Sequence, residues 1–469
     1  MSMTNSSPVD LIPRKILFGN PEKASPQISP DGTRMAYLAP VNDVLNVWVG
    51  TIGQDDYAPV TRDEERGIRF YAWAADNNHI LYLQDAAGNE NWRLYATNLA
   101  SGETRDLTPF ENVHTQVVDR NKHFPNELLI GMNNDNPQVH DVYHLDLPSG
   151  ELTLVAKNPG NIIGWGTDAN FKVRCAVTAL PDGGRGLLYR EDEQAEWEEL
   201  LVWEGDDGLN SYPLNFSLDG QSLYLVDSRN ANASRLVKMD IASGAITVIA
   251  EDPHFDVDSV MVHPDTYEIQ AVAFNKDRVE WTVLDQSIKV DFDTMRDIHP
   301  GDFAVTSRDD DDANWVVRFT VDNGPVANYA YDRKNQAATF LFDNQPALSN
   351  YTLAKMQPVT FTARDGLTVH GYLTLPPGED QNSLPMVLNV HGGPWVRDNW
   401  GYNPEAQWFA NRGYACLQLH LFMKPFINQF PSRSHFLKEF FACRFFLLRC
   451  KRWRYYRFEV VARHCWFGL

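Results

Sequence analysis

A repeat of about 47 residues constrains the fold of this chain more than any other feature of its sequence. Three short turns carry a Ser-Gly pair after an apolar run, at Ser101, Ser149 and Ser243, which are 48 and then 94 residues apart, and 94 is twice 47. The same period reaches four further polar turns, at 52–55, 193–196, 285–287 and 333–336. A repeat of this length, with about four short strands per unit, is typical of the blades of a β-propeller.

The segments between these turns have the pattern of short antiparallel strands. Residues 34–38 follow the turn Ser29-Pro30-Asp31-Gly32, and residues 222–226 follow a similar turn at 217–220. Alternating residues bounded by Asp, Asn, Gly and Pro predict a turn followed by a strand in both places. Seven registers therefore predict seven blades whose ring protects the strand edges. An irregular array of β-sandwiches with accidental spacing is the alternative.

Composition narrows the class of protein and its partners. The chain has 469 residues, 43% of them hydrophobic, and a formal net charge of -21. This length allows two to four domains, and this charge disfavours a nucleic-acid partner. The first ten residues lack an apolar signal segment, and no apolar stretch reaches the roughly 18 residues of a membrane span. Five cysteines favour a reducing cytoplasm. We predict no cofactor and no metal.

Near Asn350 the pattern changes from repeat to enzyme fold. The expected elements are two strands joined by an Asp-Gly hairpin, a buried strand, a helix and a further strand, at 360–376, 386–390, 404–412 and 414–419. Strand, hairpin, strand, glycine loop, helix and strand is the order in which an α/β-hydrolase sheet begins.

The buried strand ends abruptly at His391-Gly392-Gly393-Pro394. Glycines at such a strand end allow the backbone to approach a ligand closely, because a Cβ atom would block that approach. In α/β-hydrolases an HGG-type loop supplies a backbone N–H to the oxyanion hole. The motif is short, and it is also compatible with an ordinary tight turn.

Several motifs in this order resemble the prolyl oligopeptidase family of serine peptidases, in its acylaminoacyl-peptidase and dipeptidyl-aminopeptidase branch. They are residues 12–23, the Ser29 turn, residues 364–367 and residues 391–394. The resemblance spans roughly residues 10–419. It implies a seven-bladed propeller, a C-terminal α/β-hydrolase domain, and short peptides admitted to a cavity between the two.

The resemblance also assigns roles to individual residues. It implies that His391, Gly392, Gly393 and Pro394 belong to the oxyanion region, and that Arg397 is a candidate substrate contact. A surface ion pair is the alternative for Arg397.

The likeness stops near Leu419. The family continues with an Asn-aromatic-Arg-Gly loop, whereas residues 421–469 hold ten Phe and ten Lys or Arg against two Glu and no Asp. This tail has a formal charge of +8, which leaves -29 on residues 1–420. No Gly-x-Ser-x-Gly nucleophile elbow occurs in the 469 residues. We therefore expect no catalytic triad and an inactive chain, with His420, His435 and His464 incidental.

The tail has several interpretations. Residues 440–449 mix aromatic and basic residues as membrane-surface segments do, and residues 451–457 do so as a nucleic-acid arm does. Cys443, Cys450 and Cys465 have ligand atoms without the spacing of a zinc site. We favour out-of-frame translation or a truncated gene, because either produces an abrupt, biased composition without any partner.

The sequence thus predicts an all-β seven-bladed propeller followed by an incomplete α/β-hydrolase domain. The expected boundaries are an N-terminal segment, the propeller, the first hydrolase strands and the aberrant tail, at 1–20, 21–350, 351–420 and 421–469. The expected function is that of a serine peptidase for short peptides that has lost its catalytic residues, and a non-catalytic propeller that binds peptides or proteins is the alternative. We also expect the strand at 414–419 to leave an exposed edge. Peptide specificity and oligomeric state have no readable signal.

Overall fold

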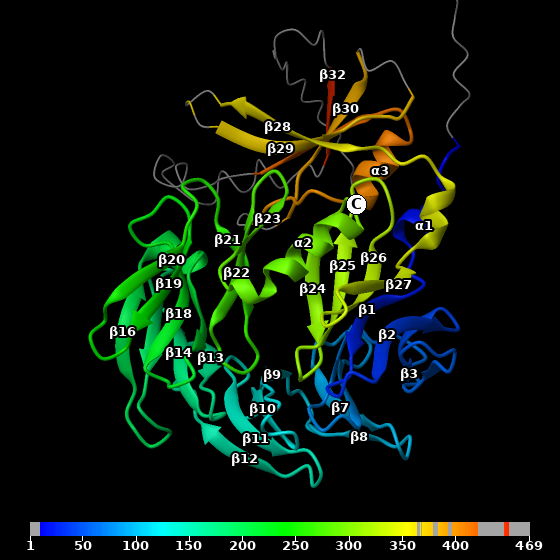
Figure 1. Ribbon diagram of the computed structural model, residues 1–469. Coiled ribbons are helices and arrows are strands. Elements are labelled where there is room, and N and C mark those ends of the chain that lie inside the picture. The colour runs from blue at the N-terminus through cyan, green and yellow to red at the C-terminus, as the bar shows by residue number, and fades with distance from the viewer. Residues whose placement is uncertain are drawn as a thin grey trace, which may run out of the picture.

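The computed structural model describes residues 10–363, 366, 368–378, 383–392 and 396–420, together with the backbone of one strand, β32 (Phe445–Arg449). Within these residues the chain forms seven small antiparallel sheets, each from consecutive strands, and then a larger eighth sheet (Figure 1). The expectation of a mostly-β chain with few helices is confirmed.

The seven small sheets, called small sheets 1 to 7, follow one another along the chain. Small sheet 1 contains β1 (Ala24–Ile28), β2 (Arg34–Val41), β3 (Val44–Thr51) and β4 (Ala58–Pro59). Small sheet 2 contains β5 (Phe70–Trp73), β6 (His79–Gln84), β7 (Arg93–Asn98) and β8 (Thr104–Asp106). Small sheet 3 contains β9 (Thr115–Asp119), β10 (Glu127–Met132), β11 (Asp141–Asp146) and β12 (Leu152–Ala156). Small sheets 4 and 5 contain β13 (Ile162–Thr167), β14 (Val173–Ala179), β15 (Arg185–Tyr189) and β16 (Glu198–Trp203); and β17 (Tyr212–Phe216), β18 (Ser222–Asp227), β19 (Arg235–Asp240) and β20 (Ile246–Ala250). Small sheets 6 and 7 contain β21 (Val257–Val262), β22 (Ile269–Asn275) and β23 (Val279–Val283); and β24 (Asp302–Arg308), β25 (Asn314–Thr320), β26 (Ala327–Asp332) and β27 (Ala337–Asp343).

The repeated Ser-Gly turns connect the third and fourth strands of small sheets 2, 3 and 5. In small sheet 3 the Ser149 hydroxyl donates to Asp146 Oδ1 at 2.6 Å, and in small sheet 5 Ser243 makes the same bond to Asp240 at 2.5 Å. The following Gly150 has a φ of 77°, a left-handed conformation that glycine adopts without strain. The repeated Ser-Gly motif therefore reflects the turn geometry that these hairpins share.

Each small sheet packs on its neighbours through a separate apolar cluster. Buried side chains join small sheet 1 to 2, 2 to 3, 3 to 4, 4 to 5, 5 to 6 and 6 to 7. A further cluster joins Met35 and Tyr37 of small sheet 1 to Phe342 of small sheet 7. The packing therefore runs from the first small sheet to the seventh and back to the first.

Small sheet 6 departs from the expected four strands. The turn predicted at 285–287 overlaps a 3-10 helix, η2 (Gln286–Ile288), which leads into α2 (Lys289–Ile298). Asp285 starts this segment by accepting a hydrogen bond from the Ser287 backbone N–H at 2.9 Å. Ile288, Phe292 and Met295 are fully buried. Apolar residues at this spacing form one face of a helix, so the helix covers the core in place of a fourth strand.

The eighth sheet has the strand order β28-β29-β31-β30-β32. Besides β32, its strands are β28 (Met356–Thr362), β29 (Thr368–Thr374), β30 (Pro385–Asn389) and β31 (Ala415–Leu419). The predicted hairpin is confirmed as the antiparallel pair β28–β29, and β30 and β31 are parallel. The expected edge is wrong, because β31 lies between β29 and β30.

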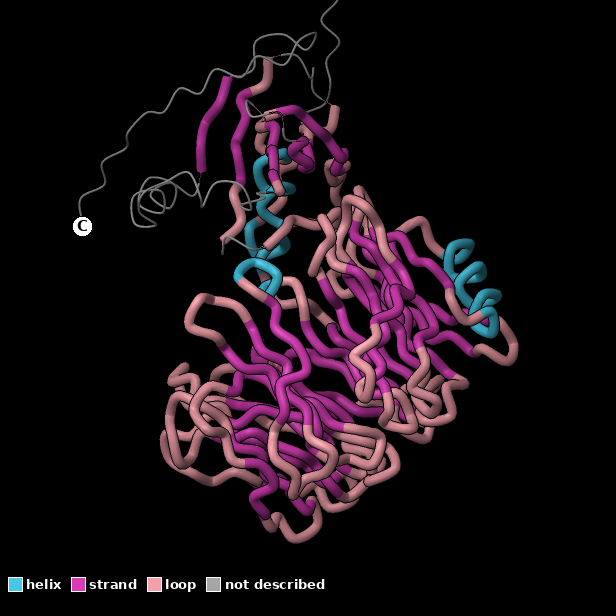
Figure 2. The backbone as a smooth tube through the Cα atoms, turned by 90° about the vertical axis from the view of Figure 1, so that its left-hand side faces the viewer, coloured by secondary structure: helices cyan, strands magenta, loops and turns pink. Residues whose placement is uncertain are grey.

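Helices lie between this sheet and the rest of the molecule (Figure 2). The predicted helix at 404–412 is confirmed as α3 (Pro404–Ala410), where the Asn403 side chain caps the Ala406 N–H at 2.9 Å. Near it lie α1 (Arg14–Phe18) and η3 (Pro346–Asn350), whose buried Leu17 and Leu348 share one cluster. The Ile12 N–H donates to Asn411 Oδ1 at 2.8 Å, so residues far apart in the sequence are joined here. One further 3-10 helix, η1 (Gly205–Leu209), follows β16.

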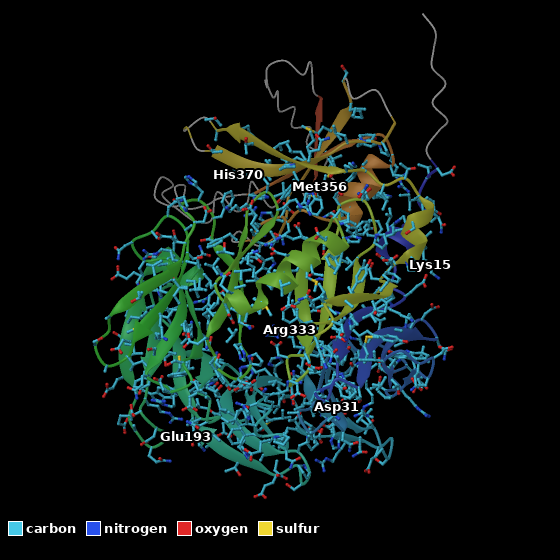
Figure 3. All side chains as sticks on the ribbon, in the orientation of Figure 1. Lys15, Asp31, Glu193, Arg333, Met356 and His370 are labelled. Atoms are coloured by element: carbon cyan, nitrogen blue, oxygen red, sulfur yellow. The ribbon has the colours of Figure 1, made fainter. Side chains whose placement is uncertain are left out.

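The two ends of the small sheets are distinct. Figure 3 shows Met356 and His370, of the eighth sheet, at one end of the molecule and Asp31, in the turn after β1, toward the other. The turns that follow β1, β9, β21 and β24 contribute Pro30, Asn121, Pro264 and Asp310 to the lining of one cavity. The first strands of the small sheets therefore begin at the end nearer the eighth sheet and finish at the far end.

In the part of the chain that is described, no helix combines the length and apolar character needed to cross a membrane.

Candidate functional site

The predicted oxyanion segment follows β30. His391 and Gly392 are described, whereas Gly393 and Pro394 lie outside the described residues. Among the described residues, no atom lies within 4 Å of a Cβ atom added at Gly392, so this part of the structure leaves the space beside it open. The half-buried His391 has its Nδ1 3.3 Å from the carbonyl oxygen of Gly392. Its Nε2 is buried and has no hydrogen-bond partner among the described residues.

Arg397 is tied to the hairpin between β22 and β23 of small sheet 6. Its guanidinium donates to the backbone carbonyl of Lys276 at 2.6 Å and also to that of Asn275. The ring of Phe255 lies below it, with 5.8 Å between Arg397 Cζ and the ring centroid. Arg397 is thus bonded to carbonyl oxygens and connects residues 396–399 to small sheet 6. Its contact with a substrate stays a prediction.

Two further bonds strengthen this junction. Asn275 Nδ2 donates to Asn399 Oδ1 at 2.7 Å and lies 3.3 Å from Asp258 Oδ1. The Tyr372 hydroxyl, on β29, donates to the carbonyl of Asp277 at 3.0 Å. The β22–β23 hairpin therefore holds both β29 and the segment after β30.

Buried polar side chains occur at Asp398 and at the end of β31, in Gln418 and His420. Gln418 Nε2, on β31, donates to Asp398 Oδ1 at 2.9 Å. Among the described residues, no partner reaches Asp398 Oδ2, Gln418 Oε1 or His420 Nε2, although all three atoms are buried. Buried polar groups of this kind cost free energy when they are left unpaired.

Burial also sets the charges of these side chains. Burial raises the pKa of the Asp398 carboxyl, and the hydrogen bond from Gln418 partly offsets this rise. Burial, together with the nearby Arg397 guanidinium, lowers the pKa of His420 to about 3. His420 is therefore neutral at pH 7. A neutral imidazole can both donate and accept a hydrogen bond.

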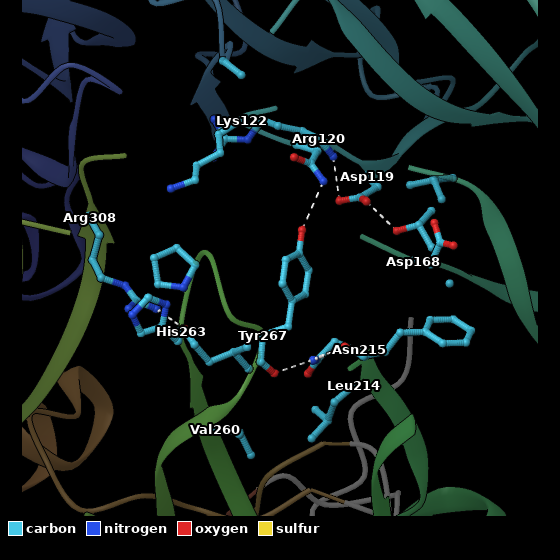
Figure 4. Close-up of a pocket in the computed structure, with 18 of the residues that line it drawn as sticks. Asp119, Arg120, Lys122, Asp168, Leu214, Asn215, Val260, His263, Tyr267 and Arg308 are labelled. Atoms are coloured by element: carbon cyan, nitrogen blue, oxygen red, sulfur yellow. Dashed lines mark hydrogen bonds between the residues drawn. The ribbon is translucent and has the colours of Figure 1, made fainter. Parts of the chain in front are cut away.

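A cavity of about 580 Å³ lies among the small sheets, and the first strand of every small sheet contributes to its lining (Figure 4). Its wall includes Trp73, Trp165, Leu214 and Val260 as well as charged residues. Pockets that mix apolar walls with a few polar groups are the usual binding sites for small ligands. We call this space the central cavity.

Hydrogen bonds join different small sheets across the far end of the central cavity, and two of the three connect sheets that are not neighbours (Figure 4). Asn121, from small sheet 3, donates through Nδ2 to the Tyr267 hydroxyl of small sheet 6 at 3.2 Å. Asn215 of small sheet 5 donates to the Tyr267 carbonyl at 3.1 Å. Lys122 Nζ donates to the Asp310 carbonyl of small sheet 7 at 2.7 Å. These bonds tie opposite sides of the small sheets together.

The residues of the β22–β23 hairpin and Asp398 were missed by sequence reasoning. A polar turn between two apolar runs marks a hairpin, but it does not say what the hairpin contacts. The 13 residues of the described chain that carry unpaired buried atoms include several in the eighth sheet, and only the structure reveals them. Among the described residues no group of three or more His, Cys, Asp or Glu could hold a metal ion.

The chain is similar to two curated peptidases, although no family model matches it. It is 40% identical over 432 residues to dipeptidyl aminopeptidase BIII of Pseudoxanthomonas mexicana, covering 89% of this chain and 63% of that protein. It is 29% identical over 453 residues to dipeptidyl peptidase family member 6 of Caenorhabditis elegans, covering 88% of this chain and 60% of that protein. The chain thus spans less than two thirds of the length of these relatives.

Solved structures share the fold. A structure from an analysis of two prolyl endopeptidases matches with a TM-score of 0.64 and 13% identity, covering 88% of this chain and 64% of that one. A puromycin-hydrolyzing peptidase of Mycobacterium tuberculosis matches with a TM-score of 0.60 and 13% identity, covering 88% and 69%. At this identity the likeness concerns the fold alone.

Proposed function

The chain belongs to the prolyl oligopeptidase family, and on this basis we propose that it takes short peptides between its small sheets and its eighth sheet. The observation that carries the proposal is the junction of Arg397 with the β22–β23 hairpin, which holds residues 396–399 against a small sheet that also lines the central cavity. A peptide bound there would contact both parts of the chain.

In the same proposal, small sheets 1 to 7 are the blades of a seven-bladed propeller covering residues 21–350. The separate cluster between each pair of neighbours, including small sheets 1 and 7, supports this arrangement. Residues 351–420 are the first part of an α/β-hydrolase domain, supported by the parallel pair β30–β31 and by α3 between them in sequence. A cytoplasmic location is proposed from the cysteine content alone.

The chemistry proposed for the complete fold is attack on a peptide carbonyl. A backbone N–H group of Gly392 or Gly393 would donate to the developing oxyanion, which is the role of the corresponding loop in α/β-hydrolases, whereas Pro394 has no N–H to donate. The open space beside Gly392 leaves room for the carbonyl oxygen. The sequence has no Gly-x-Ser-x-Gly elbow, so we propose that the 469-residue chain binds peptides without hydrolysing them.

Hydrolysis of aminoacyl- and dipeptidyl-nitroanilides by the purified chain tests this proposal. We expect no turnover above that of a mock preparation, and activity after a family C-terminal segment is grafted behind Gln418. Turnover by the ungrafted chain that persists through further purification would show that the chain is an active peptidase.

The second candidate function is that of a non-catalytic module that binds peptides or proteins. The central cavity favours it, because the first strands of all seven small sheets converge on one space of about 580 Å³. A screen of short peptides against the full chain, beside the grafted chain, separates the two candidates. Peptide binding without activity in the graft favours the module, whereas activity in the graft favours the peptidase.

We further propose that residues 421–469 arise from a shifted reading frame or a truncated gene. The abrupt change from a charge of -29 to one of +8 supports this origin. The nucleotide sequence across codons 415–425 tests it. A one-base shift should restore an Asn-aromatic-Arg-Gly loop and a later serine elbow, and an intact frame with neither would rule the proposal out.

A further inference from the structure

Four large apolar side chains remain exposed on the first strands of consecutive small sheets. Phe70 of β5 is 62% exposed, Val117 of β9 41%, Ile163 of β13 55% and Tyr212 of β17 37%. These strands all contribute other residues to the lining of the central cavity. We call the four residues the apolar rim.

The apolar rim lies at the end of the central cavity nearer the eighth sheet. Phe70, Ile163 and Tyr212 are the first or second residues of their strands, and Val117 is the middle residue of β9. The cavity-lining Trp73, Val118, Trp165 and Leu214 come later on the same strands. The turns that follow the first strands line the far end of the cavity. The strand beginnings therefore surround the opposite opening.

Contacts connect the rim to the candidate site. Tyr212 begins β17 of small sheet 5, and Asp258 lies near the beginning of β21 in small sheet 6, which packs on small sheet 5. Asp258 in turn contacts Asn275, which bonds to Asn399. The apolar rim therefore reaches the small sheet next to the one that holds Arg397 and Asn399.

We propose that the apolar rim binds apolar side chains of a peptide held beside Arg397, which makes the rim a specificity determinant. This inference rests on the proposed function and adds a substrate class to it. Exposed apolar residues gathered around one opening mark a binding surface. The exposed carboxylates of Asp256 and Asp258 on the neighbouring small sheet disfavour acidic peptides. The preferred ligand is a short peptide with aliphatic or aromatic residues and no acidic ones.

The chain supplies a matched control for this proposal. Other exposed apolar side chains, among them Leu154, Ile246, Val248 and Phe340, belong to the last strands of their small sheets. Ile246 and Val248 are each 40% exposed, close to Val117 and Ile163. Replacing either pair by serine removes similar apolar area, but only one pair borders the opening.

The experiment compares the full-length chain with V117S/I163S and with I246S/V248S. Fluorescently labelled tetrapeptides carrying leucine, serine or aspartate at their variable positions are titrated into each protein. We expect V117S/I163S to weaken leucine-peptide binding by about tenfold, the effect of losing one or two aliphatic contacts in a pocket. Binding of the serine peptides should change little, and I246S/V248S should bind every peptide as the unmodified chain does. Aspartate peptides should bind weakest to all three.

A second readout does not depend on peptide binding. Nile red, an uncharged apolar dye, should fluoresce less in V117S/I163S than in I246S/V248S, with equal melting temperatures as the fold control. If melting temperatures differ, the single variant I163S replaces the pair. If V117S/I163S binds leucine peptides as tightly as the unmodified chain does, the proposal for the apolar rim is wrong. If no peptide binds to any of the proteins, dye fluorescence that is equal in V117S/I163S and I246S/V248S would also show that the proposal is wrong. Absence of all peptide binding with a reduced dye signal would instead count against the proposed function and keep the rim as an apolar binding surface.

Discussion

Arg397, in the segment that follows β30, donates a 2.6 Å hydrogen bond to the backbone carbonyl of Lys276 in small sheet 6. The same guanidinium also donates to the carbonyl of Asn275. Arg397 and Lys276 are 121 positions apart in the sequence, and their contact joins residues 396–399 to small sheet 6. A positively charged fork between two carbonyl oxygens is a strong and directional junction.

Replacing Arg397 by alanine should loosen this junction. Hydrogen bonds to charged groups contribute about 1.5–3 kcal/mol to stability, and two carbonyls would lose their donor. Urea unfolding should show a loss in this range, and amide exchange should rise selectively in β23 and β29. Arg318, which is exposed on β25, is the matched control, and R318A should change stability by less than about 0.5 kcal/mol. Equal exchange in the two variants would contradict a junction at Arg397.

The Tyr267 hydroxyl should stabilise the far end of the central cavity. It accepts the hydrogen bond from Asn121, and small sheets 3 and 6 are not sequence neighbours. We expect Y267F to lower the free energy of unfolding by about 0.5–1.5 kcal/mol. A double-mutant cycle with N121A measures the bond itself, because the two losses should not add once the partner is gone. Fully additive losses would show that the contact contributes nothing.

The sequence predicted the repeat units well because their turns are local. The bond from Ser149 to Asp146 spans three residues, and the left-handed Gly150 follows at once, so one short motif specifies each turn. The same holds for α3, whose cap Asn403 and first residue Pro404 are adjacent. Local chemistry of this kind can be read directly from the order of residues.

The parts that could not be predicted depend on distant contacts. The period reached residues 285–287 but could not show that α2 replaces a strand, because that depends on packing of Phe292 against Phe303 and Trp315. The HGG motif located the oxyanion segment, and nothing near Arg397 indicated that its partners lie in small sheet 6. Unpaired groups such as Asp398 Oδ2 are likewise properties of the folded chain.

The packing of α2 predicts a large difference between two positions of the same helix. Phe292 is fully buried, with 5.1 Å between its ring centroid and that of Phe303, whereas Val290 is 44% exposed. F292A should cost about 3–5 kcal/mol, because it leaves a cavity among aromatic side chains. V290A should stay within about 0.5 kcal/mol of the unmodified chain. Urea unfolding of both variants measures the contrast, and similar losses would contradict a core under α2.

Acid should weaken the fold through His114 and His140. Nδ1 of His114 lies 2.8 Å from Nε2 of His140, and burial lowers the pKa of both side chains. The unfolded chain therefore binds protons more readily than the folded chain below the ordinary histidine pKa of 6.5. Stability from these groups is complete above pH 6.5 and is lost as the pH falls toward their lowered pKa values in the folded state.

The urea midpoint should therefore be lower at pH 5.5 than at pH 7.5. In H114N/H140N the difference between the two midpoints should shrink, since the replaced pair no longer takes up protons on unfolding. Replacing the exposed His254 by asparagine provides the control and should leave the difference as it is in the unmodified chain. An unchanged difference in H114N/H140N would assign the acid sensitivity to other groups, such as the buried His420.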